Sequence, residues 1–129
     1  LYNFITNESE FEKFINEVIS KKGYKNIDIW TSLAKEGSYL IPHQDSVLSD
    51  SNFEDYINCI YFVDGGDDAE YSGGTGIYND NEFLKPVFIP KNLKNSMIIY
   101  NSKSKFYHGF KIMKKNSFRK AISFQFSKH

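Results

Sequence analysis

Two histidines and one aspartate supply the residue types that hold a transition metal. His43 and Asp45 stand at positions i and i+2 at the end of a strand-like run, so both side chains can face the same way. His108 lies within another strand-like run much later in the chain. Two imidazoles and one carboxylate on one face of a metal suit Fe(II) and leave the other positions open for O2 and a second ligand. We therefore predict His43, Asp45 and His108 as the metal ligands and as the catalytic residues.

A cation follows the second histidine and strengthens this prediction. It lies in a run whose alternating residues fall on two faces, one with Arg119, Ala121, Ser123 and Gln125, the other with Phe118, Ile122, Phe124 and Phe126. The aromatic face is expected to meet a helix, which points Arg119 into the protein, where a guanidinium needs an anion. Its planar fork matches a carboxylate, so we predict that Arg119 binds the distal carboxylate of a dicarboxylic co-substrate. The alternative is an ion pair between Arg119 and an acidic loop residue.

The elements that must position these residues are one helix and a series of short strands. Apolar residues recur at helical spacing over residues 8–22, with Asn7 as the expected N-cap and Gly23 as the expected end. Over residues 26–126 the period changes to two, with turn-rich stretches between the runs. The predicted strands are Asn26–Ala34, Ser38–His43, Tyr56–Val63, Thr75–Tyr78, Pro86–Ile89, Ser96–Asn101, Phe106–Met113 and Phe118–Phe126. This pattern favours a mainly β sandwich or barrel with an N-terminal helix, as one domain over residues 1–129.

Taken together, the motifs resemble those of the prolyl-hydroxylase-like branch of the 2-oxoglutarate/Fe(II) oxygenases. They include Gly37, six residues before His43 as in G-x5-H-x-D, the middle strand Cys59–Asp64, the turn Ser72–Gly74, His108-Gly109-Phe110 and the closing strand Arg119–Phe124. The resemblance implies a double-stranded β-helix, the jelly roll of cupins. It also implies a hydroxylase that uses Fe(II), 2-oxoglutarate and O2 and releases succinate and CO2. Halogenating relatives carry a small residue in place of Asp45, so the resemblance implies hydroxylation.

The resemblance also bears on the co-substrate pocket. Relatives often carry a tyrosine three residues before the first histidine, whereas this chain has Leu40 there and Tyr39 one step earlier. Phe62 stands where relatives have a tyrosine that helps to hold the co-substrate, and Asn58 on the same face offers a polar contact instead. The predicted co-substrate contacts are therefore Arg119, Asn58 and Tyr39.

Charge is unevenly distributed along a chain whose net charge is zero. Eleven acidic residues and no Lys or Arg lie between Glu36 and Glu82, and eleven Lys or Arg and no acidic residue follow from Lys85. This asymmetry can steer charged partners, or the acidic loops can pair with the basic strands. Seven of the acids follow strands near the metal ligands and predict a cationic or amine-bearing substrate: Asp50, Glu54, Asp55, Asp64, Asp67, Asp68 and Glu70.

Several classes of function are disfavoured. Basic residues are dispersed without a nucleic-acid-binding motif, so no nucleic-acid partner is expected. No apolar run reaches the roughly 20 residues of a membrane span, so we expect a soluble, cytoplasmic protein. A peptide residue, an amino acid or a small metabolite can each be the substrate. Two other functions stay open: a non-catalytic cupin-like domain that binds a metal or another ligand, and an oxygenase without 2-oxoglutarate, which Arg119 disfavours.

Overall fold

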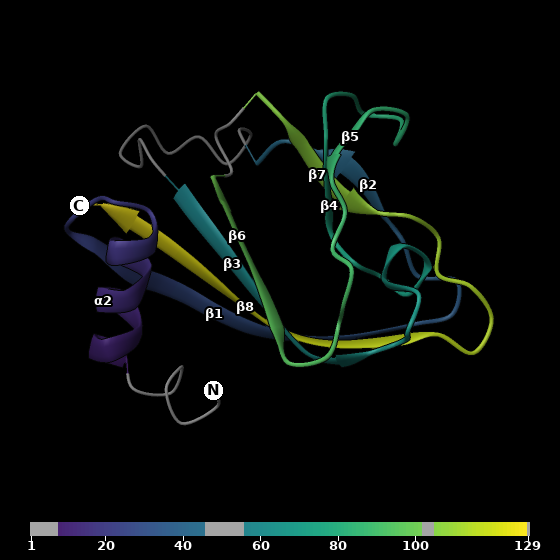
Figure 1. Ribbon diagram of the computed structural model, residues 1–129, viewed down its shortest axis with the longest axis horizontal. Helices are drawn as coiled ribbons and strands as arrows, with labels where there is room; N and C mark the ends of the chain where they lie inside the picture. The colour runs from purple at the N-terminus through teal and green to yellow at the C-terminus, as the bar shows by residue number, and fades with distance from the viewer. Residues whose placement is uncertain (1–7, 46–55, 102–104, 129) are drawn as a thin grey trace.

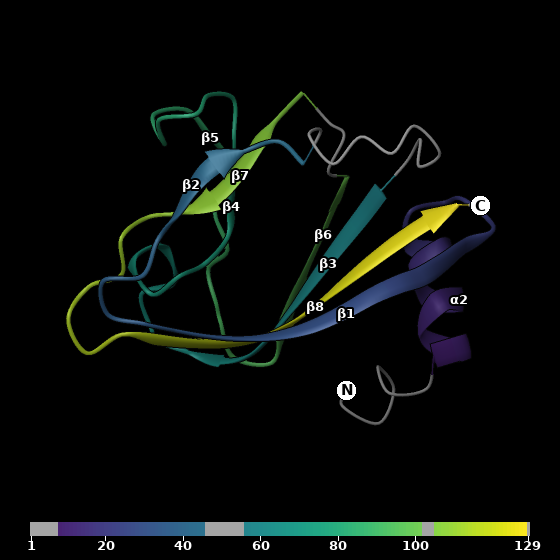
Figure 2. The same cartoon turned by 180° about the vertical axis from the view of Figure 1, so that it is seen from behind.

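The computed structural model describes residues 8–45, 56–101 and 105–128, which form a helix and two antiparallel sheets (Figures 1 and 2). The expected mainly β fold with an N-terminal helix is confirmed. Each predicted strand is present, with ends that differ by up to three residues. In chain order the elements are α2 (Glu8–Val18), β1 (Tyr24–Lys35), β2 (Leu40–His43), β3 (Tyr56–Gly65), the 3-10 helix η1 (Ala69–Tyr71), β4 (Gly76–Tyr78), β5 (Pro86–Phe88), β6 (Ser96–Asn101), β7 (Tyr107–Phe110) and β8 (Phe118–Lys128).

The helix α2 ends earlier than the sequence predicts. Ser20 adopts a left-handed backbone with φ of 54°, and its amide donates to the Glu17 carbonyl oxygen. The amide of Lys21 donates to the Asn16 carbonyl oxygen, which completes a Schellman motif. The prediction that Gly23 ends the helix is therefore wrong; with φ of 84°, Gly23 instead turns the chain into β1. The predicted N-cap, Asn7, lies outside the described residues.

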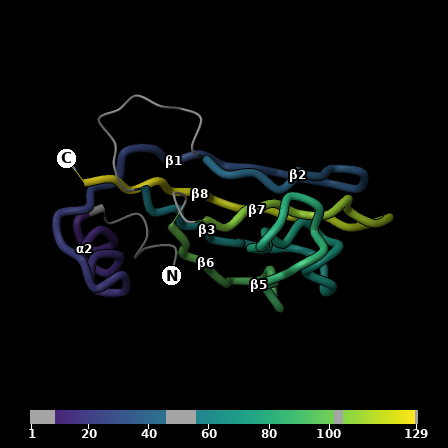
Figure 3. The backbone as a smooth tube through the Cα atoms, turned by 90° about the horizontal axis from the view of Figure 1, so that it is seen from above, coloured from purple at the N-terminus to yellow at the C-terminus, as the bar shows by residue number. Residues whose placement is uncertain are grey.

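The two sheets each contain four strands, and the chain passes back and forth between them. We call the sheet with strand order β1-β8-β3-β6 sheet A, and the sheet with order β2-β7-β4-β5 sheet B. Along the chain, β1, β3, β6 and β8 alternate with β2, β4–β5 and β7, so the chain crosses between sheets after nearly every strand. Seen from above, α2 lies at one end of the molecule, and β2, β5 and β7 lie toward the other (Figure 3). This alternation is that of a jelly roll.

The helix covers the aromatic face of β8, as predicted. Phe11 packs edge-on against Phe124 and Phe126, with ring centroids 4.8 and 5.6 Å apart. These side chains and Ile15 belong to a buried cluster that also includes residues of β1 and β3. The side chains on the opposite face of β8 therefore point toward sheet B. Among the described residues, no helix is both long and apolar enough to span a bilayer.

Candidate metal centre and its cavity

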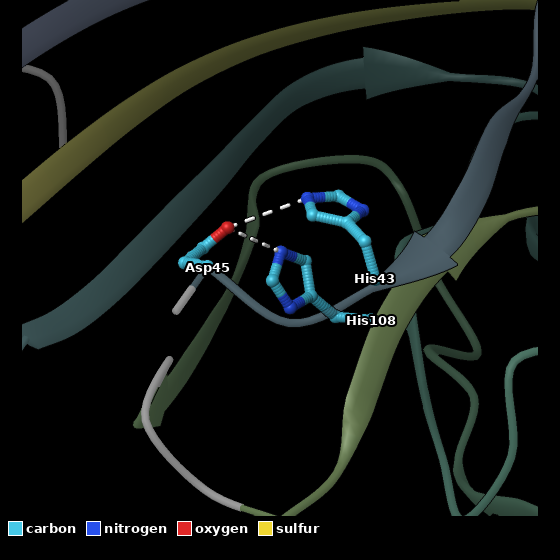
Figure 4. Close-up of side chains that lie close together, drawn as sticks. All are labelled: His43, Asp45 and His108. Carbon is cyan, nitrogen blue, oxygen red and sulfur yellow. Dashed lines mark ion pairs between the residues drawn. The ribbon is translucent and has the colours of Figure 1, made fainter. Parts of the chain in front are cut away.

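Sheet B brings the two predicted histidine ligands together. The strands β2 and β7 pair so that His43 and His108 are register partners, and their ring centroids lie 4.3 Å apart. Asp45 follows the end of β2, and its Oδ1 atom lies 3.3 Å from Nε2 of each histidine (Figure 4). The three candidate ligand atoms all lie within 4.8 Å of one another. The structure thus unites the three residues that the sequence predicts as ligands.

The donor atoms are oriented as a metal requires. Nδ1 of His43 lies 2.9 Å from the Ile41 carbonyl oxygen, which can only accept a hydrogen bond. A proton on Nδ1 leaves the lone pair of Nε2 directed at Asp45, the usual arrangement in metal-binding histidines. Burial raises the pKa of Asp45, but the hydrogen bonds and positive charge of its neighbours, foremost His108, outweigh that effect and lower the pKa below its usual value. Asp45 is therefore a carboxylate at neutral pH and a suitable anionic ligand.

Asn58 holds the second carboxylate oxygen of Asp45. Its Nδ2 atom donates to Asp45 Oδ2 at 2.7 Å, and its Oδ1 atom accepts from Gln125 Nε2 at 3.4 Å. The contact joins sheet A to the residue that follows β2, because Asn58 belongs to β3 and Gln125 to β8. The interaction leaves Asp45 Oδ1 as the atom that faces both histidines. The structure therefore places Asn58 in the cavity, with its amide on a candidate metal ligand.

Arg119 is a buried cation with no carboxylate partner among the described residues. Its side chain is 7% exposed, and Nη1 donates to the Gly73 carbonyl oxygen at 2.7 Å and to Thr75 Oγ1 at 3.1 Å. The Nε atom is buried without a hydrogen-bond partner. The guanidinium lies 4.7 Å from the centre of the Phe110 ring. Burial lowers the pKa of Arg119 to about 10, so the group stays charged at neutral pH.

The three candidate metal ligands and Arg119 line one cavity of about 650 Å³. Tyr100 also lines it, with its ring centroid 4.9 Å from that of His108. Burial, followed by the charge of Asp45, raises the pKa of Tyr100. The sequence analysis did not single out Tyr100, which the pairing of β3 with β6 places opposite Asn58. Tyr39, a predicted co-substrate contact, is 63% exposed and is not among the residues that line the cavity.

The acidic residues of the loop after β3 lie away from the cavity. Three of them form ion pairs with lysines of the basic half of the chain: Asp67 with Lys94, Asp68 with Lys114 and Glu70 with Lys111. Neither these residues nor Asp64 line the cavity. The other acids of the substrate prediction, Asp50, Glu54 and Asp55, lie outside the described residues. Pairing between the acidic and basic halves thus occurs in the folded chain.

The fold is similar to that of solved iron oxygenases. The prolyl-4-hydroxylase of Pseudomonas putida superposes with a TM-score of 0.67 at 10% identity, over 95% of this chain and 65% of that one. An oxidoreductase of the 2OG-Fe(II) oxygenase family from Burkholderia pseudomallei gives 0.69 at 13% identity, over 97% and 55%. HygX from Streptomyces hygroscopicus, solved with nickel and 2-oxoglutarate bound, gives 0.70 at 10% identity, over 98% and 66%.

These likenesses concern the fold and about two thirds or less of each solved protein. No protein-family model matches the sequence, and no curated protein matches it either. The chain spans 55–66% of the length of the three solved structures named above. It has the jelly-roll fold of the 2-oxoglutarate/Fe(II) oxygenases, and the resemblance expected from its motifs is confirmed at the level of structure.

Proposed function

We propose that this chain is an Fe(II)- and 2-oxoglutarate-dependent oxygenase that hydroxylates a C–H bond of a peptide residue, an amino acid or a small metabolite. One observation carries the proposal: a His-Asp-His cluster that could hold a metal and a buried arginine, without a carboxylate partner in the described part of the chain, line the same cavity. The cluster can bind a metal, and the arginine can bind an anion. A dicarboxylate that binds the metal with one end and Arg119 with the other satisfies both.

The metal ligands in this proposal are Nε2 of His43, Nε2 of His108 and Oδ1 of Asp45. These atoms offer two nitrogens and one oxygen, the mixture that suits Fe(II), and they occupy one face of the centre. Asp45 binds through one oxygen because Asn58 occupies the other. The structure of HygX with nickel and 2-oxoglutarate bound supports the proposal that this fold can bind a metal and a dicarboxylate together.

Arg119 orients the co-substrate in this proposal. Its guanidinium is already fixed by Gly73 and Thr75, so little side-chain entropy is lost when a carboxylate binds. The orphaned Nε atom gains a hydrogen-bond partner, and the buried positive charge gains a counter-ion. Thr75 lies beside Nη1 and lines the cavity, so its hydroxyl is a second contact for the same carboxylate.

The bound metal and co-substrate supply the oxidising chemistry: one oxygen atom of O2 enters the substrate as hydroxyl, and the other enters succinate as 2-oxoglutarate loses CO2. The protein's own part is to hold these groups at one side of the substrate and to limit their access to water. The buried side chains of His108 and Arg119 and the half-buried ring of Tyr100 do so from three strands. Asp45 occupies a ligand position as a carboxylate, which leaves no vacancy for a halide and favours hydroxylation.

Succinate release tests the proposal directly. The protein loaded with Fe(II) and incubated with 2-oxoglutarate under O2 is expected to form succinate slowly even without its substrate. Asp45→Ala removes a metal ligand and should abolish this turnover, whereas Asp67→Asn, which removes the same charge outside the cavity, should retain it. Turnover that survives Asp45→Ala would contradict the assignment of the ligands.

The second candidate is a cupin-like domain that binds a metal or another ligand without catalysis. It shares the same cluster and cavity but requires no co-substrate turnover. Calorimetry that detects binding of Zn(II) and 2-oxoglutarate, combined with no succinate under any condition with Fe(II), would favour this candidate over the oxygenase.

A further inference from the structure

The inner face of sheet A carries its side chains in rows that run across four strands. One row consists of the register partners Asp28, Gln125, Asn58 and Tyr100, from β1, β8, β3 and β6. Every member is polar, and each lines the cavity. Asn58 donates a hydrogen bond to Asp45, so the row passes the candidate metal ligands at β3 and ends at Asp28 on the edge strand β1. Adjacent strands lie about 4.8 Å apart, so Asp28 stands roughly 10 Å from Asn58 along the row.

Trp30 lies beside Asp28 on the same face of β1 and also lines the cavity. It is 43% exposed, on an edge strand whose residues 28–31 are all exposed. A carboxylate and an indole ring at neighbouring positions provide the two groups that bind organic cations, by charge and by cation–π attraction. Asp28 and Trp30 are thus exposed side chains on the wall of the cavity that also contains the candidate metal ligands, where a substrate can reach them.

The charges in the cavity single out Asp28. Asp45 and Asp28 are the carboxylates among the described residues that line it. With Fe(II) and the 2-oxoglutarate dianion bound, the charges of those two groups cancel, and Arg119 cancels Asp45. Asp28 remains as the unbalanced charge, and a cationic substrate neutralises it.

We infer that Asp28 and Trp30 recognise an amine-bearing, cationic substrate and hold it against the metal centre. This inference rests on the proposed function for the reaction. The recognition itself depends on Asp28 and Trp30 of β1, which the proposed function does not use. It keeps the cationic substrate that the sequence predicts, yet assigns it to different residues. The acidic loop after β3 is neutralised by lysines, whereas Asp28 has no lysine or arginine partner among the described ion pairs.

Trp30 supplies the readout, because it is the only tryptophan in the chain. The protein loaded with redox-inert Zn(II) and 2-oxoglutarate is titrated with n-pentylamine and, separately, with 1-pentanol, while tryptophan fluorescence is followed. The two probes have the same alkyl chain and differ in charge. We expect the amine to change the fluorescence in a saturable manner and the alcohol to bind about tenfold more weakly or not at all.

Two variants with the same change of charge decide the origin of the effect. Asp28→Asn keeps the shape of the side chain and should weaken amine binding about two- to fivefold, while the remaining cation–π contact with Trp30 keeps the amine above the alcohol. Asp67→Asn removes a charge from the far loop and should leave amine binding unchanged. Equal responses to amine and alcohol, an unaltered amine response in Asp28→Asn, or the same loss in both variants would overturn the inference.

Succinate release by the Fe(II)-loaded wild-type protein separates this inference from the proposed function. Saturable, Asp28-dependent amine binding without any succinate supports the recognition site and counts against the oxygenase. Succinate release together with no preference for the amine supports the oxygenase and overturns the recognition site.

Discussion

Arg119 is stabilised by dipoles and aromatic rings. Its guanidinium is held by a backbone carbonyl, a threonine hydroxyl and the ring faces of Phe62 and Phe110. Such contacts are weaker than a carboxylate for a buried cation, which pays a desolvation penalty of several kcal/mol without a counter-ion. The residue is therefore a cost to the stability of the ligand-free protein and a benefit to the binding of an anion.

Replacement of Arg119 by methionine is expected to separate these two effects. Affinity for 2-oxoglutarate in the presence of Zn(II) should fall about 100-fold or more, because each charge-assisted hydrogen bond contributes about 1.5–3 kcal/mol. The free energy of unfolding without ligand should stay within about 1 kcal/mol of the wild-type value or rise. Calorimetry and urea denaturation measure the two quantities. Lys120→Met alters the exposed neighbour on the opposite face of β8 and should change neither; equal 2-oxoglutarate affinity in Arg119→Met and wild type would contradict the proposed role.

Asn58 is a positioning residue for Asp45 in the proposed centre. Loss of a group that orients a metal ligand typically weakens metal binding about 10–100-fold. We expect a loss of this size in Asn58→Ala, measured by competition with a chelator for Co(II) or Zn(II). Gln125→Ala removes only the longer bond to Asn58 and should weaken binding less. A wild-type affinity in Asn58→Ala would show that the contact with Asp45 has no influence on the metal.

Residue types and spacing were enough to predict the metal cluster, but not the contacts of Asn58. The H-x-D pair and the second histidine are the residue types of a two-histidine, one-carboxylate metal site, and Arg119 eleven residues after His108 strengthened that prediction. The partner of Asn58 depends on how far sheet B approaches sheet A, and no local pattern encodes that distance. Tyr100 was missed for a related reason: its place opposite Asn58 requires the pairing of β3 with β6, which is known only once the sheet is formed.

At the scale of elements, the pairing of β2 with β7 controls the histidines. Gly109 follows His108 and makes this pairing close: a Cβ atom there would lie 2.5 Å from the Leu40 carbonyl oxygen and 3.0 Å from the backbone of Pro42. Backbone atoms cannot move aside as the end of a flexible side chain can. The small residue after the second histidine thus has a packing role in bringing β2 against β7.

Gly109→Ala is expected to force β2 away from β7. The free energy of unfolding should fall by about 1–3 kcal/mol, and metal affinity should fall with it because His43 and His108 separate. Gly37→Ala is the matched control: Gly37 has φ of 81° but open space around its Cβ position, so it should cost about 1 kcal/mol in strain and retain metal affinity. Denaturation and chelator competition on both variants measure the effects, and normal metal binding by Gly109→Ala would refute the role of close strand packing.

The elements themselves were largely predictable from hydrophobic period, while their ends were not. The strands were found because short runs of β-branched, aromatic and alternating residues are separated by turn-rich stretches, and the helix because Phe11 and Ile15 recur on one face. The helix end was misplaced because glycine is the usual residue for a left-handed C-terminal position, whereas here Ser20 adopts it. The pattern that predicts an element averages over many residues, but its end depends on one.

At the scale of the whole molecule, the two sheets differ in how they are stabilised. The buried hydrophobic clusters of the described residues are formed by α2, sheet A and the loops, and neither includes a residue of sheet B. The space between the sheets near the candidate metal ligands is the cavity, which both polar and apolar side chains line. The histidines come from sheet B, whereas Arg119 and Asn58 come from sheet A. A metal and a dicarboxylate bound in that cavity would therefore connect the sheets.

Ligand binding is accordingly expected to stabilise β2 and β7 more than the helix-covered end of sheet A. Each ligand at 100 times its dissociation constant should add about 2.7 kcal/mol to the free energy of unfolding. Hydrogen exchange should show slower exchange of β2 and β7 amides with Zn(II), and a further decrease when 2-oxoglutarate is added. In Arg119→Met the effect of Zn(II) should persist and the additional effect of 2-oxoglutarate should disappear, since the metal ligands are intact and the anion contact is lost. Protection that rises equally in both sheets, or only around α2, would contradict a ligand that bridges sheet B to sheet A. Sheet B contributes no residue to the hydrophobic clusters of the described residues, so a bridging ligand should stabilise sheet B the most.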